Sequence, residues 1–154
     1  MESHYFGNMN RRWFEDLALG KGIERDFLER VMVAFQNAYQ TFGDDTRFDI
    51  GIPELDVTVE VKFDIKSLET GNIVIEYFHR RPSGILVSEA THWLFVTGEE
   101  EIWISQRELT KCLLVNAVEP RQIHGPEDRH PKYVFLLKVD LLRAFANGVR
   151  KLGT

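Results

Sequence analysis

The chain has 154 residues, of which 28% are charged and 44% hydrophobic, and its formal net charge is −5. This mixture is typical of a single globular domain and excludes intrinsically disordered and fibrous proteins. The acidic balance argues against a uniformly basic protein that coats nucleic acid without sequence preference. A single cysteine, Cys112, excludes an internal disulfide and a zinc site built from several thiolates.

No apolar run approaches the roughly 18 to 20 residues that a transmembrane helix needs. The N-terminal sequence also lacks the apolar core of a secretory signal. We therefore expect a cytoplasmic protein without a membrane partner. We expect one domain over residues 1–154, in which residues 1–22 form a lead-in that ends at the helix-breaking run Gly20-Lys21-Gly22.

The first half of the chain predicts one helix and three strands. Apolar residues at spacings of three and four predict an amphipathic helix from Ile23 to Phe42, ended by Gly43. Alternation with period two then predicts strands over Arg47–Ile52, Asp56–Asp64 and Asn72–Phe78. The short connections between these strands favour an antiparallel meander. We expect the helix to cover the sheet face that holds Phe48, Val59 and Ile75.

The second half alternates helices and strands. A capping box, Ser105-Gln106-Arg107-Glu108, predicts that a helix follows over Arg107–Val115. The remaining elements are a short helix from Ser88, strands over His92–Thr97, Glu101–Ser105 and Tyr133–Lys138, a polar loop over 119–132, and a closing helix over Leu141–Leu152. This order predicts a mixed α/β fold, in which helices flank a mixed central β-sheet.

The strand over Asp56–Asp64 carries the chemistry. Its apolar residues account for one face, so Glu60 and Lys62 share the opposite face with other acids. Asp49 and Glu76 likewise oppose the apolar residues of their own strands. If the three strands pair as a meander, all four side chains converge, since facing Cβ atoms lie about 5 Å apart.

Clustered carboxylates repel one another, and a hard cation relieves this repulsion. Mg²⁺ prefers oxygen ligands and retains several waters, one of which can attack a phosphodiester. Lys62 could act on that water or stabilise charge on the phosphate. Polar residues that alternate along a strand also occur on solvated sheet faces, so Glu60-Val61-Lys62 alone does not identify a site.

The run DIGIPELDVTVEVKFD, with Asp49 and Glu60-Val61-Lys62, resembles the PD-(D/E)XK nuclease superfamily. The following TGNIVIEYFHRRPSGILVSEATHW is similar to small phage and prokaryotic members. The resemblance spans roughly Ile23 to Val96. It implies a restriction-endonuclease-like core and Mg²⁺-dependent endonuclease activity on DNA, of the resolvase or repair kind, with Mn²⁺ as a substitute. Asp49 and Glu60 would be the metal ligands, and Asp49, Glu60, Lys62 and Glu76 the catalytic residues.

One feature departs from the pattern of this superfamily, because Phe48 rather than proline precedes Asp49. Asp56, and with less support Glu54, therefore remains an alternative first acid; Asp49 is preferred because it lies on a separate strand. Glu24 stands where many members place an auxiliary acid. An acid in the first turn of a helix also favours the helix dipole, so Glu24 has a structural explanation as well.

Basic residues directly follow the Asn72–Phe78 strand. His79, Arg80 and Arg81 are candidates for phosphate contacts beside the site, with Ser83 as a further candidate. The alternative for these basic residues is a solvated hairpin end. For the whole chain, the alternative is a non-catalytic protein that keeps the nuclease fold and binds nucleic acid or a host protein. A homodimer is plausible because cutting both strands of DNA needs two sites.

Overall fold

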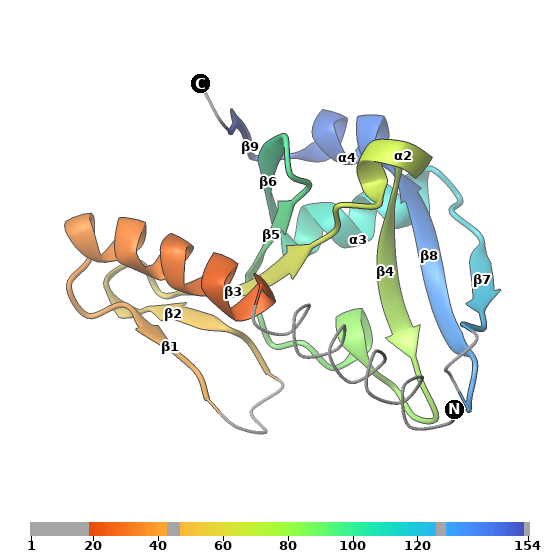
Figure 1. The fold of residues 1–154 in the computed structure, drawn as a ribbon, viewed down its shortest axis with the longest axis horizontal. Helices are drawn as coiled ribbons and strands as arrows, with labels where there is room; N and C mark the ends of the chain where they lie inside the picture. Colours follow the sequence, from red (N-terminus) through yellow and green to blue (C-terminus); the bar gives the residue numbers. More distant parts are fainter. Residues whose placement is uncertain (1–18, 43–46, 126–128, 153–154) are drawn as a thin grey trace, which may run out of the picture.

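The computed structural model describes residues 19–42, 47–125 and 129–152, which form two β-sheets with helices around them (Figure 1). The larger sheet has the strand order β1-β2-β3-β5-β6-β9. Strands β3 and β5 run parallel, and all other neighbours in this sheet are antiparallel. The mixed central sheet confirms the predicted α/β class. Its strands are β1 (Tyr39–Gln40), β2 (Ile50–Ile52), β3 (Val57–Phe63), β5 (His92–Val96), β6 (Glu100–Ser105) and β9 (Gly148–Lys151).

The smaller sheet is antiparallel and has the order β4-β8-β7. Its strands are β4 (Asn72–Phe78), β8 (Lys132–Lys138) and β7 (Pro120–Ile123). The predicted meander of three strands is therefore wrong, since β4 pairs with β8 and β5 takes the place beside β3. The strand β7 also lies within the segment 119–132 that the sequence predicted to be a loop.

The connection between β3 and β4 explains this difference. It contains the single helical turn α2 (Ser67–Thr70), followed by Gly71 in the left-handed region at φ 73°. The Asp64 carboxylate accepts hydrogen bonds from the backbone N–H groups of Ser67, at 3.2 Å, and Val74, at 3.1 Å. This turn carries β4 out of the larger sheet. Residues 93–96 of β5 are apolar and buried on both faces, which suits the central position.

Two hydrophobic clusters lie on opposite faces of the larger sheet. A helix over residues 19–34 covers one face, where Phe27 packs with Ile50, Val59 and Leu94. The other face packs against the smaller sheet and against the helices α3 (Gln106–Val115) and α4 (Val139–Phe145). Val59 therefore faces the first helix as predicted, whereas Ile75 belongs to the second cluster. None of the helices in the described part is long and apolar enough to cross a membrane.

The first helix differs from the prediction at both ends. It already includes Gly20-Lys21-Gly22, which the sequence assigned to a break, and it ends at residue 34 rather than at Phe42. A turn follows, in which the N–H of Asn37 donates to the carboxylate of Glu54 at 3.1 Å. This turn directs the chain into β1, so the apolar residues after it belong to a strand.

The C-terminal half confirms one predicted helix and corrects two others. Helix α3 begins where the capping box placed it, because the Ser105 hydroxyl accepts from the N–H of Glu108 at 3.1 Å. The closing helix ends at Phe145, since the Asn147 side chain accepts from the N–H of Ser105 at 2.7 Å and draws the chain into β9. No α-helix begins at Ser88; a 3-10 turn, η2 (Gly84–Leu86), precedes it.

Candidate active site

A cleft of about 620 Å³ opens between the two sheets, on the side of β3 away from the first helix. One wall comes from the larger sheet, and the other from the end of β4 and the loop that follows it. Although the predicted meander is absent, the four predicted catalytic side chains all line this cleft. The lining residues are Asp49, Glu60, Lys62, Glu76, Arg81, Pro82, Ser83, Gly84 and Val87.

The alternation of β3 places Glu60 and Lys62 in the cleft. Val59 and Val61 of this strand are buried under the first helix, so Glu60 and Lys62, which alternate with them, face the opposite side. The parallel register pairs Glu60 with Trp93 and Lys62 with Phe95 of β5. Both aromatic residues belong to the cluster between the two sheets, which confirms that Glu60 and Lys62 face the smaller sheet.

Asp49 lies just before β2 and is held by two backbone contacts with β3. Its N–H donates to the carbonyl of Val59 at 2.9 Å, which continues the ladder by one residue. Its carboxylate accepts from the N–H of Val61 at 2.8 Å. The side chain is therefore fixed beside β3, at the register position opposite Glu60.

Burial raises the pKa of both acids in this wall. For Glu60, loss of hydration is the main cause and raises the pKa from its usual 4.5 to about 7; the charges of Asp49 and Glu24 add to it, and Lys62 opposes it. For Asp49, burial raises the pKa, and the hydrogen bond from Val61 opposes the shift. Ionisation of these two carboxyl groups is therefore less favourable in the cleft than in water, unless a cation binds beside them.

Only one of the two oxygens of the Glu60 carboxylate has a polar partner among the described residues. Its Oε1 lies 3.3 Å from the Nζ of Lys62, whereas its buried Oε2 has no hydrogen-bond partner among the described residues. Ser83, on the opposite wall, has a buried hydroxyl that also lacks a partner in that part of the chain. Both atoms belong to residues that line the cleft, and buried polar atoms of this kind usually bond to a polar partner such as water or an ion.

Glu24 lies close enough for its charge to raise the pKa of both Asp49 and Glu60. Its carboxylate accepts from Nε2 of Gln40 at 2.8 Å and lies 3.3 Å from the Nζ of Lys21. No sequence pattern predicted either partner. Lys21 stands three residues before Glu24, a spacing that would have identified the pair had the helix been extended to residue 19.

Asp56, the alternative first acid, does not line the cleft. It is exposed, at φ 52°, where it ends the 3-10 turn η1 (Pro53–Leu55) before β3. Glu54 is bound to the backbone of Asn37 and is likewise outside the lining. Of the three acids that the sequence left open, Asp49 is therefore the one that the fold brings to Glu60.

The loop after β4 forms the second wall. Gly84 adopts φ 51°, and a Cβ at this position would lie 2.1 Å from the carbonyl oxygen of Glu76, so only glycine allows this close approach. The N–H of Ser83 donates to the carbonyl of Tyr77 at 3.0 Å, which fixes the loop on the strand. Arg81 and Ser83 thereby line the cleft, whereas His79 and Arg80, the other predicted phosphate contacts, lie outside the lining.

Glu76 has a basic neighbour that the sequence did not associate with it. The Nζ of Lys132, on β8, lies 4.0 Å from the Glu76 carboxylate. Pairing of β4 with β8 creates this proximity, because Glu76 stands opposite Val134.

Among the residues described, no three Asp, Glu, His or Cys side chains are close enough to form a ready-made metal site. Comparisons with protein-family models, with curated proteins and with solved structures found no significant match.

Proposed function

We propose that the chain is a cytoplasmic, divalent-metal-dependent nuclease that hydrolyses phosphodiester bonds in DNA, as the resemblance to the PD-(D/E)XK superfamily implies. The observation that carries this proposal is the unpaired, buried Oε2 of Glu60, in a cleft shared with Asp49 and Lys62. A buried carboxylate without a partner is costly, and a bound cation is a common compensation. Two acids with a neighbouring lysine are also the catalytic groups that the resemblance to this superfamily implies.

The donor set fits Mg²⁺ or Mn²⁺. Mg²⁺ is usually held by one or two carboxylates together with waters and substrate phosphate, and Asp49 and Glu60 would supply the two carboxylates. When bound, the ion supplies Lewis acidity and lowers the pKa of a coordinated water. The raised pKa values of both acids mean that metal binding has to displace protons at mildly acidic pH, so affinity is expected to increase with pH.

The other side chains of the cleft can position a phosphodiester. Lys62 is half exposed beside Glu60, where its ammonium group can donate to the attacking water or to a phosphate oxygen. Arg81 and Ser83 line the second wall, from which the guanidinium group and, after a rotation of its side chain, the hydroxyl would donate to the remaining oxygens. Glu76 lines the same wall and would assist directly or through a water.

The proposal is tested by incubating the purified protein with supercoiled, linear and branched DNA in Mg²⁺, Mn²⁺ or EDTA. We expect cleavage that requires the metal. Lys62→Ala should abolish most turnover yet keep metal binding, measured by calorimetry, whereas Glu60→Ala should lose both. Lys111→Ala, which removes an exposed lysine on α3, is the matched control and should behave as wild type.

A non-catalytic nucleic-acid-binding protein is the second candidate. It is favoured by one observation, the lack of a group of three metal-binding side chains in the described ranges. Such a protein should bind DNA equally well in Mg²⁺ and EDTA and cleave no form of it. That result would refute the nuclease proposal in favour of a binding protein.

If the protein cleaves both strands of a duplex, a homodimer would supply the second site, and sedimentation of the protein on DNA would reveal the dimer.

A further inference from the structure

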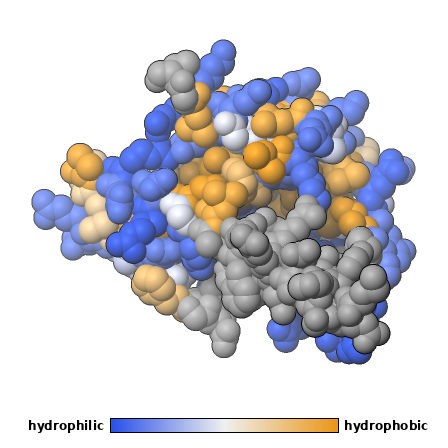
Figure 2. Space-filling model, viewed as in Figure 1, coloured by the Kyte–Doolittle hydropathy of each residue, from blue (hydrophilic) through white to orange (hydrophobic). Residues whose placement is uncertain are grey.

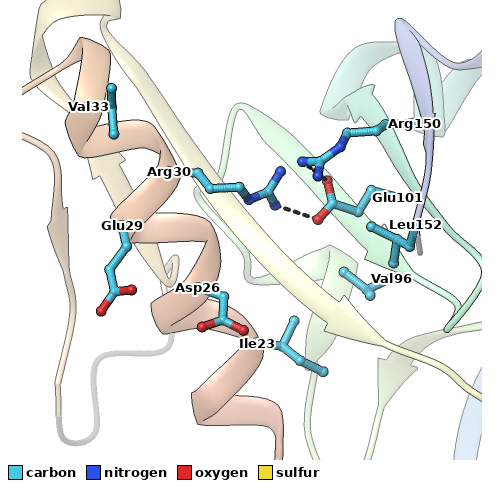
Figure 3. A pocket seen from close by; sticks show the side chains of 9 residues that line it. All are labelled: Ile23, Asp26, Glu29, Arg30, Val33, Val96, Glu101, Arg150 and Leu152. Carbon is cyan, nitrogen blue, oxygen red and sulfur yellow. Dashed lines mark hydrogen bonds and ion pairs between the residues drawn. The ribbon is translucent and has the colours of Figure 1, made fainter. Parts of the chain in front are cut away.

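The hollow on the helix side of the larger sheet has its charges matched within the protein. It measures about 570 Å³ and lies between the first helix and the strands β6 and β9, where Figure 2 shows hydrophobic surface. Arg30 of the helix donates to one oxygen of the Glu101 carboxylate, and Arg150 of β9 lies 3.7 Å from the other oxygen (Figure 3). Asp26 and Glu29 line the same hollow, so its acids and arginines leave little excess charge to select a ligand.

Tyr39 presents an aromatic ring on the other face of this sheet, which is the face of the cleft. The register places Tyr39 opposite Gly51, and Gly51 opposite Thr58. These three residues alternate with the apolar ones that pack under the first helix, so they lie on the opposite face. Glu60 follows Thr58 by two residues in β3 and therefore lies on that same face, about 7 Å further along the strand.

Gly51 fixes the position of this ring. A Cβ at Gly51 would lie 2.5 Å from two ring carbons of Tyr39 and 2.7 Å from its hydroxyl oxygen, so the ring rests directly on the glycine backbone. The Phe48 ring meets it edge-on, with 6.2 Å between the centroids. Tyr39 nevertheless remains 46% exposed. The ring is thus held in place and is still open to a ligand.

The row of residues under this ring leads to the loop after β4, which forms the second wall of the cleft. The Thr58 hydroxyl donates to the carbonyl of Glu89 at 3.2 Å, which fixes the end of the loop on β3. Val87 of the same loop lines the cleft. Tyr39 and Glu60 therefore belong to adjacent rows of one surface, and the loop borders both.

The cleft has room for one strand of nucleic acid. Its volume of about 620 Å³ is that of a site for a single drug-sized ligand, and the Glu60 side chain in its wall is only 12% exposed. A phosphodiester therefore has to enter the cleft to reach this carboxylate. In a duplex each base is stacked between its neighbours, whereas a single strand can offer its base faces to aromatic side chains.

We propose that the nuclease acts on DNA that is unpaired at the cleaved bond, and that Tyr39 stacks on the base beside the scissile phosphate. Lys62 and Arg81 contact the backbone in the cleft while the ring holds the adjoining base. Positive groups along the backbone and aromatic rings under the bases are the usual combination for single strands. This inference rests on the proposed nuclease function, because the cleft supplies the phosphate site. The alternative is a structural role, in which the ring only covers Gly51.

The test uses a single-stranded oligonucleotide of about 12 nucleotides, within the usual site size for single strands. One fluorescent 2-aminopurine is moved along it, and Ca²⁺ replaces Mg²⁺ because both bind oxygen ligands. Wild type should quench the fluorescence at one position and bind the strand at least about tenfold more tightly than the matching duplex. Tyr39→Leu keeps an apolar cover over Gly51; it should remove the quenching and weaken binding about fivefold or more, as the loss of one stacked base implies. Tyr39→Phe should retain both.

Leu114→Ala, which removes an exposed apolar side chain on α3, is the matched control and should bind as wild type. Circular dichroism checks that each variant is folded. Wild-type affinity in Tyr39→Leu, or equal binding of strand and duplex, would overturn the inference. Metal-dependent cleavage of duplex DNA that Tyr39→Leu does not impair would do so too, and would leave the proposed nuclease function intact. Quenching that depends on Tyr39, without metal-dependent cleavage of any DNA, would support the stacking contact and refute the nuclease function.

Discussion

The replacement of Glu60 by glutamine should change how the stability of the protein depends on pH. The Glu60 pKa is raised from 4.5 to about 7, mainly because the side chain is buried and only 12% exposed. The folded protein therefore holds this proton more tightly than the unfolded chain does. Its free energy of unfolding should fall as the pH rises from about 4.5 to about 7, because ionised Glu60 is disfavoured in the cleft. This pKa shift corresponds to a loss of about 3 kcal/mol in the free energy of unfolding across that pH range.

Glu60→Gln keeps the shape of the side chain and removes this ionisation. The free energy of unfolding of the variant, relative to that of wild type, should increase by about 3 kcal/mol between pH 4.5 and pH 8. Urea unfolding at several pH values measures this difference. Asp49 ionises in both proteins, so its contribution largely cancels in the difference. Glu69→Gln, which removes an exposed carboxylate on α2, is the control and should show no such trend.

Two outcomes would refute this reasoning. If the stability difference between Glu60→Gln and wild type is the same at pH 4.5 and pH 8, Glu60 is not desolvated as the structure indicates. If the difference has the opposite sign, the ion pair with Lys62 outweighs the burial of the carboxylate. In the proposed nuclease, excess Mg²⁺ should remove much of the pH dependence of the wild-type protein, because the bound ion stabilises ionised Glu60.

Three further predictions concern the loop after β4 and the start of α3. Gly84→Ala should lower the free energy of unfolding by at least about 3 kcal/mol, whereas Gly71→Ala, at positive φ but in open space, should cost only about 1 to 2 kcal/mol. Ser105→Ala should lower the melting temperature through the loss of an N-cap worth about 1 kcal/mol. Reversal of charge at Arg80 and Arg81 should weaken DNA binding. The slope of log K against log salt concentration should become less steep by about 0.9 for each phosphate contact that is lost. An unchanged affinity across the salt series would reject a role of these arginines in phosphate binding.

Local patterns predicted the elements of this fold better than they predicted its pairing. The capping box at Ser105 located the start of α3 because the signal and the structure involve the same four residues. The patterns that predicted β8 and the alternation of β3 also lie within a few neighbouring residues. No such pattern predicts the partner strand of β4, because the pairing depends on the direction in which α2 and Asp64 lead the chain. Short turns favour a hairpin only when no helical turn intervenes.

The C-terminal helix and the first helix were predicted to be too long for a similar reason. Apolar residues at helical spacing continue past residue 34 and past Phe145, but in both places a hydrogen bond to a distant segment redirects the chain. At the first boundary the Glu54 carboxylate accepts from the N–H of Asn37, and at the second the Asn147 side chain accepts from the N–H of Ser105. Such contacts join segments that are 17 and 42 residues apart, and no periodicity within one segment reveals them.

The candidate site was found from strand parity even though the assumed pairing was wrong, and the fold explains how. Parity decides only which face of β3 carries Glu60 and Lys62, and that face looks toward the smaller sheet. The apolar cluster between the sheets fills the space next to β5 and β6, and it leaves the space next to β3 to polar groups. Glu76 enters that space from the smaller sheet rather than from a neighbouring strand. The carboxylates thus come from two sheets that pack against each other through one apolar cluster, so a ligand that binds both walls would add a polar link between sheets that the core already joins.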